Sequence, residues 1–187
     1  MRTDYKVLGN YIRLVDERNR DLSVTNLLGV SIGKKFIPSI ANIVGTDLSS
    51  YKIVKTGQFA YGPVTSRNGE KISIAYREGE DCVVSSAYQV FEIKQKNRLL
   101  PEYLMMWYKR TEFDRYARYM SKGSAHEFFE YSDMEEVKIP IPDIKIQEAI
   151  ANIYSVYMTR KRLNEQLKTQ IKDICPILIR GSLEESK

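Results

Sequence analysis

The chain has 187 residues and a formal net charge of +5, from 29 basic and 24 acidic residues. This small positive excess permits a nucleic-acid partner but does not require one. Hydrophobic residues make up 43% of the chain and charged residues 28%, which excludes an intrinsically disordered protein. The length suits one sizeable domain with an appendage, because two full domains would need a longer chain.

The cysteine and histidine content argues against a bound metal. Cys82 and Cys175 form no Cys-x-x-Cys pattern, and His126 is the single histidine. No set of zinc ligands at the usual spacing therefore exists, and we expect neither a metal nor a cofactor. Free thiols, the lack of a signal peptide and the lack of a membrane-length apolar run predict a cytoplasmic protein with no membrane partner.

The first half of the chain is predicted to be rich in β-structure. A short helix at residues 8–15 and a strand at residues 25–32 come first. Short segments dominated by Val, Ile, Tyr and Phe then alternate with turn residues, at 51–54, 58–61, 72–76 and 82–93. This pattern favours a curled antiparallel or mixed sheet over alternating strands and helices.

Two helices and an edge strand follow. Pro101 suits the first turn of a helix, and Thr111 with Asp114 matches the capping-box pattern that starts another. The core is expected to contain the aromatic residues of this second helix, Phe113, Tyr116 and Tyr119. Residues 137–142 alternate as a strand, and their two prolines place it at the edge or end of a sheet.

The C-terminal segment has the spacing of a coiled-coil helix. Residues on one face recur in alternating steps of four and three, and we call this row the seam: Ile146, Ile150, Ile153, Tyr157, Arg160, Asn164, Leu167, Ile171, Ile174 and Leu178. Up to Cys175 the helix would extend about 50 Å, and Pro176 is expected to end or kink it. The stripe either folds back on its own domain or pairs with another chain. The lack of a second helix of similar length favours a homodimer with antiparallel helices.

The expected fold class is α+β. A β-rich domain with flanking helices spans residues 1–142, a long coiled-coil helix spans residues 143–180, and a tail spans residues 181–187. The central seam positions Arg160 and Asn164 are polar. A polar seam residue often determines the register and the choice of partner at some cost in stability.

Known catalytic patterns are absent from the sequence. There is no Walker-type phosphate loop, no Gly-x-Gly-x-x-Gly fingerprint and no Gly-x-Ser-x-Gly elbow. Glu136, Val137 and Lys138 match the Glu-x-Lys element of metal-dependent nucleases, but this element lies before Pro142 and Asp143 rather than after them. We therefore expect no catalytic residue, and a small metal-dependent nuclease is the enzymatic alternative.

Five segments, in order, resemble one half of the specificity subunit of type I restriction–modification systems: TNLLGVSIGKKFIPSIAN, YKIVKTGQFAYGPVTSRNGEKISIA, VVSSAYQVFEI, LLPEYLMMWYKRTEFDRYAR and EEVKIPIPDIKIQEAI. The resemblance implies a target-recognition domain followed by a long spacer helix. A full-length subunit has two such units, whose helices pair antiparallel, and each domain recognises one half of a split double-stranded DNA site. The resemblance further implies that the subunit does no chemistry. It positions methyltransferase subunits and, in the complete enzyme, the restriction subunit.

The chain departs from this family pattern because it has a single recognition domain and a single helix. It is therefore a natural half-subunit, a gene fragment or a truncated form, and the sequence leaves these three open. Two further functions remain as alternatives to DNA recognition: a decoy that occupies methyltransferase subunits, and a dimerising scaffold.

Two loops are the candidates for DNA contact. The first contains Thr65, Ser66, Arg67 and Asn68, with Lys71 behind them, where Asn68 and Gly69 mark a hairpin turn. Arg suits guanine, Asn suits adenine, and Ser or Thr suits either base. The second loop offers Lys122, Ser124 and His126, where Gly123 permits close approach and a lysine suits a phosphate. For each loop the alternative is a solvated connection.

Overall fold

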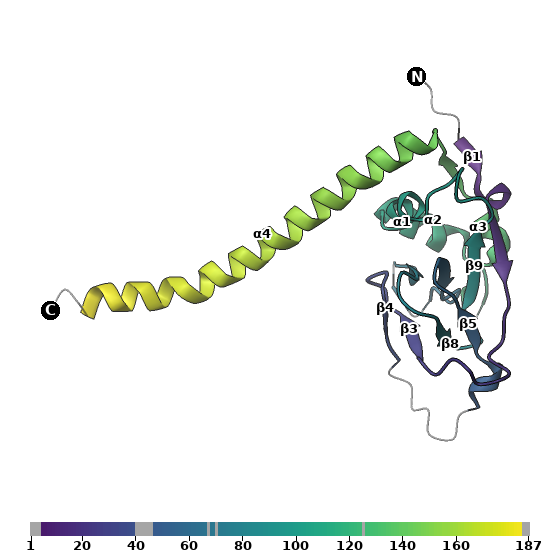
Figure 1. Cartoon of the computed structure of the whole chain (residues 1–187), viewed down its shortest axis with the longest axis horizontal. Coiled ribbons are helices and arrows are strands. Elements are labelled where there is room, and N and C mark those ends of the chain that lie inside the picture. The colour runs from purple at the N-terminus through teal and green to yellow at the C-terminus, as the bar shows by residue number, and fades with distance from the viewer. Residues whose placement is uncertain (1–4, 40–46, 67, 70, 125, 185–187) are drawn as a thin grey trace. The chain divides into compact units, whose positions relative to one another are not determined.

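The computed structural model describes residues 5–39, 47–66, 68–69, 71–124 and 126–184, with side chains up to residue 180. The chain divides into two compact units between Gln147 and Glu148 (Figure 1). Of the elements described, every strand lies in the first unit, and the second unit consists of most of one long helix.

An antiparallel sheet of four strands forms the centre of the first unit, in the order β2-β9-β6-β7. Its strands are β2 (Ile12–Val15), β9 (Gln89–Ile93), β6 (Gln58–Tyr61) and β7 (Ile74–Tyr76). Every residue of β6 is buried, and Phe59 on this strand pairs with Phe91 of β9 and with Tyr76 of β7. The hairpin predicted from residues 58–61 and 72–76 is thereby confirmed.

Three further antiparallel pairs accompany this sheet. They are β1 (Tyr5–Val7) with β10 (Lys138–Pro140), β3 (Leu28–Val30) with β4 (Phe36–Pro38), and β5 (Lys52–Val54) with β8 (Cys82–Val84). The run predicted at 82–93 thus divides between β8 and β9, which belong to different sheets. A turn in which the Tyr88 N–H donates to the Ser85 carbonyl (3.0 Å) separates the two strands.

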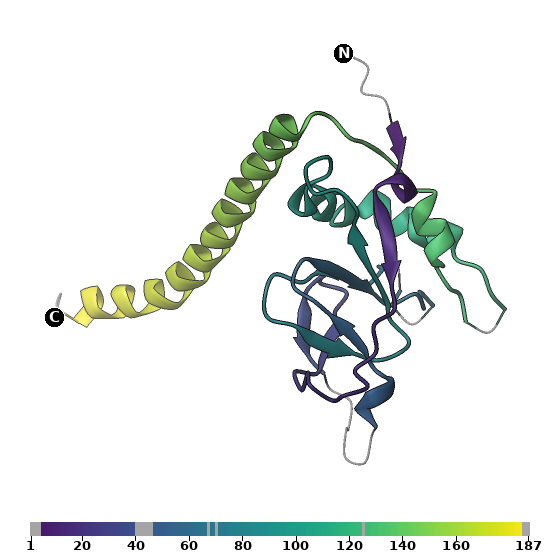
Figure 2. The ribbon, with the colours of Figure 1, turned by 45° about the vertical axis from the view of Figure 1, so that its right-hand side comes forward.

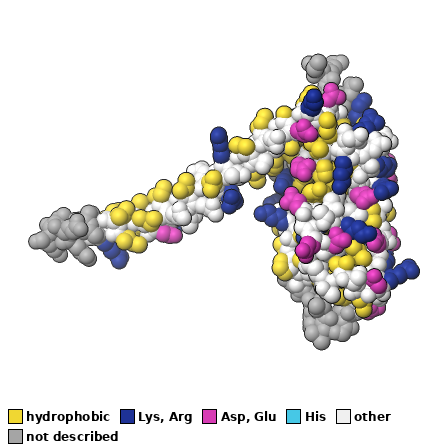
Figure 3. Space-filling model, viewed as in Figure 1, with side chains coloured by type: hydrophobic (Ala, Val, Ile, Leu, Met, Phe, Trp, Pro, Cys, Tyr) yellow, Lys and Arg dark blue, Asp and Glu magenta, His cyan; other side chains and the backbone are white. Residues whose placement is uncertain are grey.

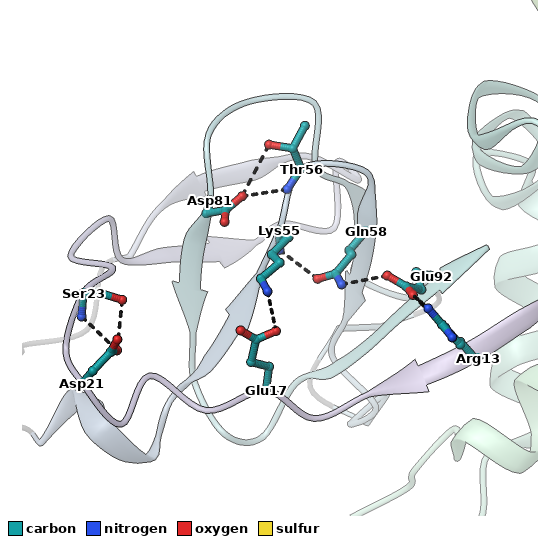
Figure 4. Close-up of polar contacts among 9 residues, drawn as sticks. All are labelled: Arg13, Glu17, Asp21, Ser23, Lys55, Thr56, Gln58, Asp81 and Glu92. Atoms are coloured by element: carbon teal, nitrogen blue, oxygen red, sulfur yellow. Dashed lines mark hydrogen bonds and ion pairs between the residues drawn. The ribbon is translucent and has the colours of Figure 1, made fainter. Parts of the chain in front are cut away.

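Polar side chains tie the strands of the central sheet together (Figure 4). The Glu92 carboxylate on β9 accepts hydrogen bonds from Arg13 Nε on β2 (2.7 Å) and from Gln58 Nε2 on β6 (2.9 Å). Partial burial raises the pKa of Glu92, but the hydrogen bonds from Gln58 and Arg13 and the Arg13 charge outweigh it. The pKa of Glu92 therefore lies below its ordinary value.

Three helices enclose an aromatic core with this sheet: α1 (Pro101–Tyr108), α2 (Thr111–Met120) and α3 (Tyr131–Glu135). Figure 2 shows them, in teal to green, gathered at one end of the first unit. The rings of Phe59 and Phe91 stack with centroids 5.0 Å apart, and Tyr108 meets both rings edge-on. Such aromatic pairs add to the free energy gained by burying their area.

The expectation that Tyr119 belongs to the core is wrong. Phe113 on the same helix is 8% exposed and Tyr116 is half-buried, but Tyr119 is 86% exposed. Tyr119 lies with Arg115 and Arg118 on the face of α2 that is directed away from the core.

The expectation of a helix at residues 8–15 is also wrong. A 3-10 turn, η1 (Leu8–Asn10), is followed directly by strand β2. Ile12 is fully buried and pairs with Ile93 of β9. Strand pairing with a distant segment therefore outweighs the local helical spacing. A second 3-10 turn, η2 (Leu48–Ser50), precedes β5.

The capping box expected at the start of α2 does not form. Arg110 occupies the N-cap position and Thr111 is the first helical residue. The Asp114 carboxylate, which would complete such a box, instead accepts hydrogen bonds from Lys34 Nζ (2.6 Å) and from the Ile72 N–H (3.2 Å).

The long helix α4 (Ile144–Glu184) confirms the predicted C-terminal helix and the α+β class. Gln147 attaches its first turn to the first unit. The buried Gln147 side chain donates to the carbonyls of Arg98 (2.8 Å) and Pro142 (2.7 Å) and accepts from the Leu100 N–H (3.0 Å). The first compact unit therefore extends a few residues beyond the expected limit at residue 142.

The helix does not end at Pro176, which lies inside α4. A proline removes one backbone donor and crowds the preceding turn, but helical residues continue on both sides of this one. None of the helices in the described ranges is both long and apolar enough to cross a lipid bilayer.

Candidate nucleic-acid interface

The two loops predicted for DNA contact lie side by side. Loop A (residues 62–73) connects β6 to β7, and loop B (residues 121–130) connects α2 to α3. The Thr65 N–H donates to the Glu127 carbonyl (2.9 Å), and the Phe129 N–H donates to the Pro63 carbonyl (2.8 Å). Although Thr65 and Glu127 are 62 residues apart in the sequence, the two loops form one continuous surface.

Thr65 lies behind this surface rather than on it. It is 2% exposed, and its Oγ1 donates to Ser121 Oγ (2.8 Å), which in turn donates to the Ala117 carbonyl (2.6 Å). The hydroxyl of Tyr61 on β6 donates to the Phe129 carbonyl (3.3 Å), and burial raises the Tyr61 pKa, which keeps this donor protonated. Both loops are therefore attached to the buried part of the unit.

The exposed part of loop A carries the remaining predicted contacts. Ser66 and Lys71 are exposed, whereas Asn68 is half-buried because its Nδ2 donates to the Val64 carbonyl (3.3 Å). Gly69 has a φ of +63°, which agrees with the turn predicted at Asn68 and Gly69. Arg67 lies outside the described residues.

Loop B is a compact turn closed by its own main chain. Lys122 and Phe128 exchange two backbone hydrogen bonds, of 3.0 and 2.9 Å. Gly123 has a φ of +137°, and a Cβ there would lie 1.9 Å from the His126 carbonyl oxygen, so the turn requires glycine. Ser124 and His126 are exposed, and the Lys122 side chain is 78% exposed, with its ammonium group 3.5 Å from the buried Asp133 carboxylate. All three predicted contacts of loop B therefore face solvent.

The exposed face of α2 adds groups that the sequence analysis did not single out. Arg115, Arg118 and Tyr119 are exposed there, and the Arg118 guanidinium pairs with the Glu127 carboxylate of loop B. Basic and aromatic side chains are the types that bind phosphates and base faces. Their helical spacing opposite the buried Phe113 and Ala117 was the available signal in the sequence.

Most of the seam of α4 is exposed. Its larger apolar members are between 49% and 71% exposed: Ile146, Ile153, Tyr157, Leu167, Ile171, Ile174 and Leu178. Ile150 is half-buried and Asn164 is exposed. Figure 3 shows hydrophobic side chains in a row along the visible face of the helix. Apolar surface of this extent typically marks an interaction site.

A second apolar row lies beside the seam. Ala149, Val156, Leu163 and Ile177 follow a seven-residue repeat that Gln170 interrupts. Val156, Leu163 and Ile177 are 52%, 47% and 68% exposed. A two-helix coiled coil needs only the seam, whereas a helix with one more apolar row suits a larger bundle. The steps of three and four that predict the seam do not include this row, although its seven-residue repeat is visible in the sequence.

The possible nuclease element lies elsewhere in the first unit. Glu136 and Lys138 line an apolar groove of about 680 Å³. The other carboxylate that lines this groove, Glu112, is paired with Arg110 (3.3 Å). In the part of the chain that the structure describes, no group of three or more His, Cys, Asp or Glu side chains could hold a metal ion. This geometry gives the nuclease alternative no support.

Comparison with known proteins points to one family. The model of the type I restriction modification DNA specificity domain matches residues 34–173. No curated protein sequence matches the chain. Among solved structures, the chain is similar to the HsdS subunit from Thermoanaerobacter tengcongensis, with a TM-score of 0.69 and 18% identity over 97% of this chain and 48% of that one.

Two other solved structures have a similar fold. The S subunit of a type I restriction–modification system from M. genitalium has a TM-score of 0.52 and 16% identity, over 84% of this chain and 39% of that one. A chain from a structural study of complex assembly and conformational transition of the type I R-M system has a TM-score of 0.56 and 12% identity. That match covers 91% of this chain and 43% of that one. The chain thus spans about half the length, or less, of each of these three proteins.

Proposed function

Because the chain belongs to the type I restriction modification DNA specificity domain family, we propose that it recognises one half-site of double-stranded DNA and positions methyltransferase subunits on it. The family is a non-catalytic recognition component, so the bound methyltransferase supplies the chemistry. The main support is the single surface formed by loops A and B, where exposed polar and basic side chains are attached to a rigid core.

We assign base contacts and phosphate contacts to different residues of this surface. Base contacts are assigned to loop A, through Ser66, Asn68 and the predicted Arg67, because these side chains can discriminate base edges in the major groove. Phosphate contacts are assigned to Lys71 and Lys122, which are exposed lysines. Loop B adds two exposed polar side chains, Ser124 and His126.

The test of this function is a gel shift without divalent metal. We expect a shift of a duplex selected from a random library and a weaker shift of a scrambled duplex of equal length. Metal-dependent cleavage of the duplex would favour the nuclease. Co-purification with a methyltransferase subunit without any DNA preference would favour the decoy or scaffold.

The exposed seam supports a homodimer with antiparallel α4 helices. The steps between seam residues follow the same order in either chain direction. If two antiparallel seams overlap over their full length, Ile146 lies against the partner's Leu178 and Ile150 against the partner's Ile174. In this register Arg160 lies opposite the partner's Asn164, whose side-chain oxygen can accept a hydrogen bond from the guanidinium. Glu165, another possible partner for Arg160, is already paired with Lys168 in its own helix (3.2 Å).

A homodimer of this kind predicts the symmetry of the DNA site, because its two recognition domains would be identical. A two-fold axis through the helix pair would make the recognised DNA an inverted repeat with an unread spacer. A footprint on selected DNA should therefore show two symmetric half-sites, and a continuous asymmetric site would contradict the homodimer.

The apolar row beside the seam supports the methyltransferase contact. Val156, Leu163 and Ile177 widen the apolar face beyond the seam. We assign this row to a helix of the methyltransferase subunit, packed beside the pair of α4 helices. Contact with the restriction subunit is also proposed, and it rests on family membership alone.

A further inference from the structure

We propose that α2 is the frame that holds loop A in its DNA-binding conformation. A buried pair, Asp114 with Lys34, holds one end of the loop, and the Thr65–Ser121 hydrogen bond holds the other. These are positioning residues, since none of the four needs to touch DNA. The inference rests on the proposed function, because it concerns the same DNA surface.

One carboxylate joins three parts of the first unit. Asp114 Oδ1, in the first turn of α2, lies 2.6 Å from Lys34 Nζ, and the two side chains are 8% and 6% exposed. The same oxygen accepts a hydrogen bond from the Ile72 N–H (3.2 Å). Ile72 is 1% exposed and directly follows Lys71, so this bond holds the chain where loop A returns to β7.

Lys34 reaches this site from the turn between β3 and β4. Its φ is +60°, and its N–H donates to the Ser31 carbonyl (2.9 Å). Its ammonium group also donates to the Tyr108 carbonyl at the end of α1. Burial lowers the pKa of Lys34, and the hydrogen bond and charge of Asp114 oppose that change. The lysine thus neutralises a carboxylate that would otherwise be buried unpaired.

The other end of loop A is held at the opposite end of α2. Ser121, the C-cap residue of this helix, accepts the hydrogen bond from Thr65 Oγ1 and donates to the Ala117 carbonyl. The exposed residues of loop A therefore lie between two attachment points on a single helix. A shift of either point would displace the predicted base contacts.

The buried pair of Asp114 and Lys34 is better explained by positioning of loop A than by a gain in stability. A buried ion pair can often be replaced by apolar residues of similar volume without loss of stability. An apolar pair, however, offers no acceptor to the Ile72 N–H, and a buried unpaired donor is costly. The carboxylate is thus suited to orienting loop A, which apolar packing could not do.

The test compares two double variants of similar volume. Lys34→Met/Asp114→Asn removes both charges but keeps an oxygen for the Ile72 N–H, whereas Lys34→Met/Asp114→Leu removes the oxygen as well. The affinities for a selected and a scrambled duplex are measured at fixed salt, with circular dichroism as the check of folding. We expect the asparagine variant to retain the wild-type ratio of the two affinities. The leucine variant should lose roughly fivefold or more of it, the equivalent of one base contact.

Val54→Ala is the control for a loss of stability alone. Val54 is fully buried in β5, in a cluster that contains neither Asp114 nor Lys34. This variant should lower the melting temperature and leave the affinity ratio unchanged. If the leucine double variant does not fold, Thr65→Val against Thr65→Ser makes the same comparison at the other end of loop A, because only serine keeps the hydroxyl.

The outcomes separate the two proposals. A wild-type protein with no preference among duplexes would contradict the proposed function itself. A wild-type protein with a clear preference, which the folded leucine variant retains, would overturn the framing role of α2. Faster hydrogen exchange of the Ile72 amide in the leucine variant, together with a lower affinity ratio, would support it.

Discussion

Thr65 and Ser121 lie 56 residues apart in the sequence, and their hydroxyl oxygens lie 2.8 Å apart in the structure. This hydrogen bond connects loop A to loop B at the C-terminal end of α2. Substitutions in either loop are therefore expected to affect recognition of the same DNA half-site. The type of effect should differ with the group that each residue contacts.

Arg67→Ala is expected to reduce sequence preference more than general affinity. A bidentate contact between arginine and guanine contributes about 1–3 kcal/mol of discrimination, whereas a phosphate contact favours all sequences alike. Binding to matched and scrambled duplexes at fixed salt measures the difference. Arg20→Ala, at an exposed position outside both loops, is the control. Equal weakening on both duplexes would make Arg67 a backbone contact.

Lys122→Ala is expected to weaken binding to every duplex by a similar factor. The exposed ammonium group would exchange its contact with Asp133 (3.5 Å) for one phosphate, so its removal should flatten the slope of log affinity against log salt by about one unit. Titrations over a range of salt concentrations give this slope. Lys35→Ala, at an exposed position outside both loops, should keep the wild-type slope. An unchanged slope for Lys122→Ala would remove this lysine from the interface.

Leu167→Asp with Ile171→Asp is expected to shift the protein from dimer to monomer. Both side chains lie on the seam and are exposed in the single chain, and antiparallel pairing would bury the new charges without partners. Light scattering at micromolar concentration measures the change. Gln166→Asp with Thr169→Asp adds the same charge off the seam and should remain dimeric. A monomeric wild-type protein would contradict the homodimer.

Val156→Asp is expected to weaken co-purification with a methyltransferase subunit and to leave the dimer intact. Val156 is 52% exposed and lies in the row beside the seam rather than on it. A charge there would face the proposed third helix of the bundle. Thr159→Asp, which adds the same charge outside both rows, is the control. Loss of the dimer in Val156→Asp would show that this row belongs to the homodimer contact instead.

As the pH falls, the free energy of unfolding of the wild-type protein is expected to decrease more steeply than that of the Glu92→Gln variant. The pKa of Glu92 lies below its ordinary value of 4.5. The stabilisation from the charged form is complete above that value, and it is lost as the pH falls through the lower pKa of the folded state. Urea unfolding between neutral pH and about pH 3 measures the free energy. Parallel pH profiles for both proteins would contradict this role, and Glu78→Gln at an exposed position is the control.

The family, the long helix and the β6–β7 hairpin could be predicted from the sequence because each is encoded in contiguous residues. The seam depends only on steps of three and four along one segment. The turn of loop A depends on neighbouring residues that tolerate positive φ, as Gly69 does. Family resemblance likewise rests on ordered segments of adjacent residues, and the match over residues 34–173 confirms it.

Only the tertiary structure decided how distant segments meet. Residues 12–15 show helical spacing but form β2, because β9 offers a strand to pair with and a buried site for Ile12. Asp114 follows Thr111 at capping distance, yet its carboxylate bonds with Lys34 and Ile72. Loops A and B likewise come together only in the folded chain, because Thr65 and Ser121 are far apart in the sequence. Local patterns limit the conformations that a segment can adopt. The segments that it contacts in the folded chain then select one of these conformations, because buried polar groups need hydrogen-bond partners in the interior.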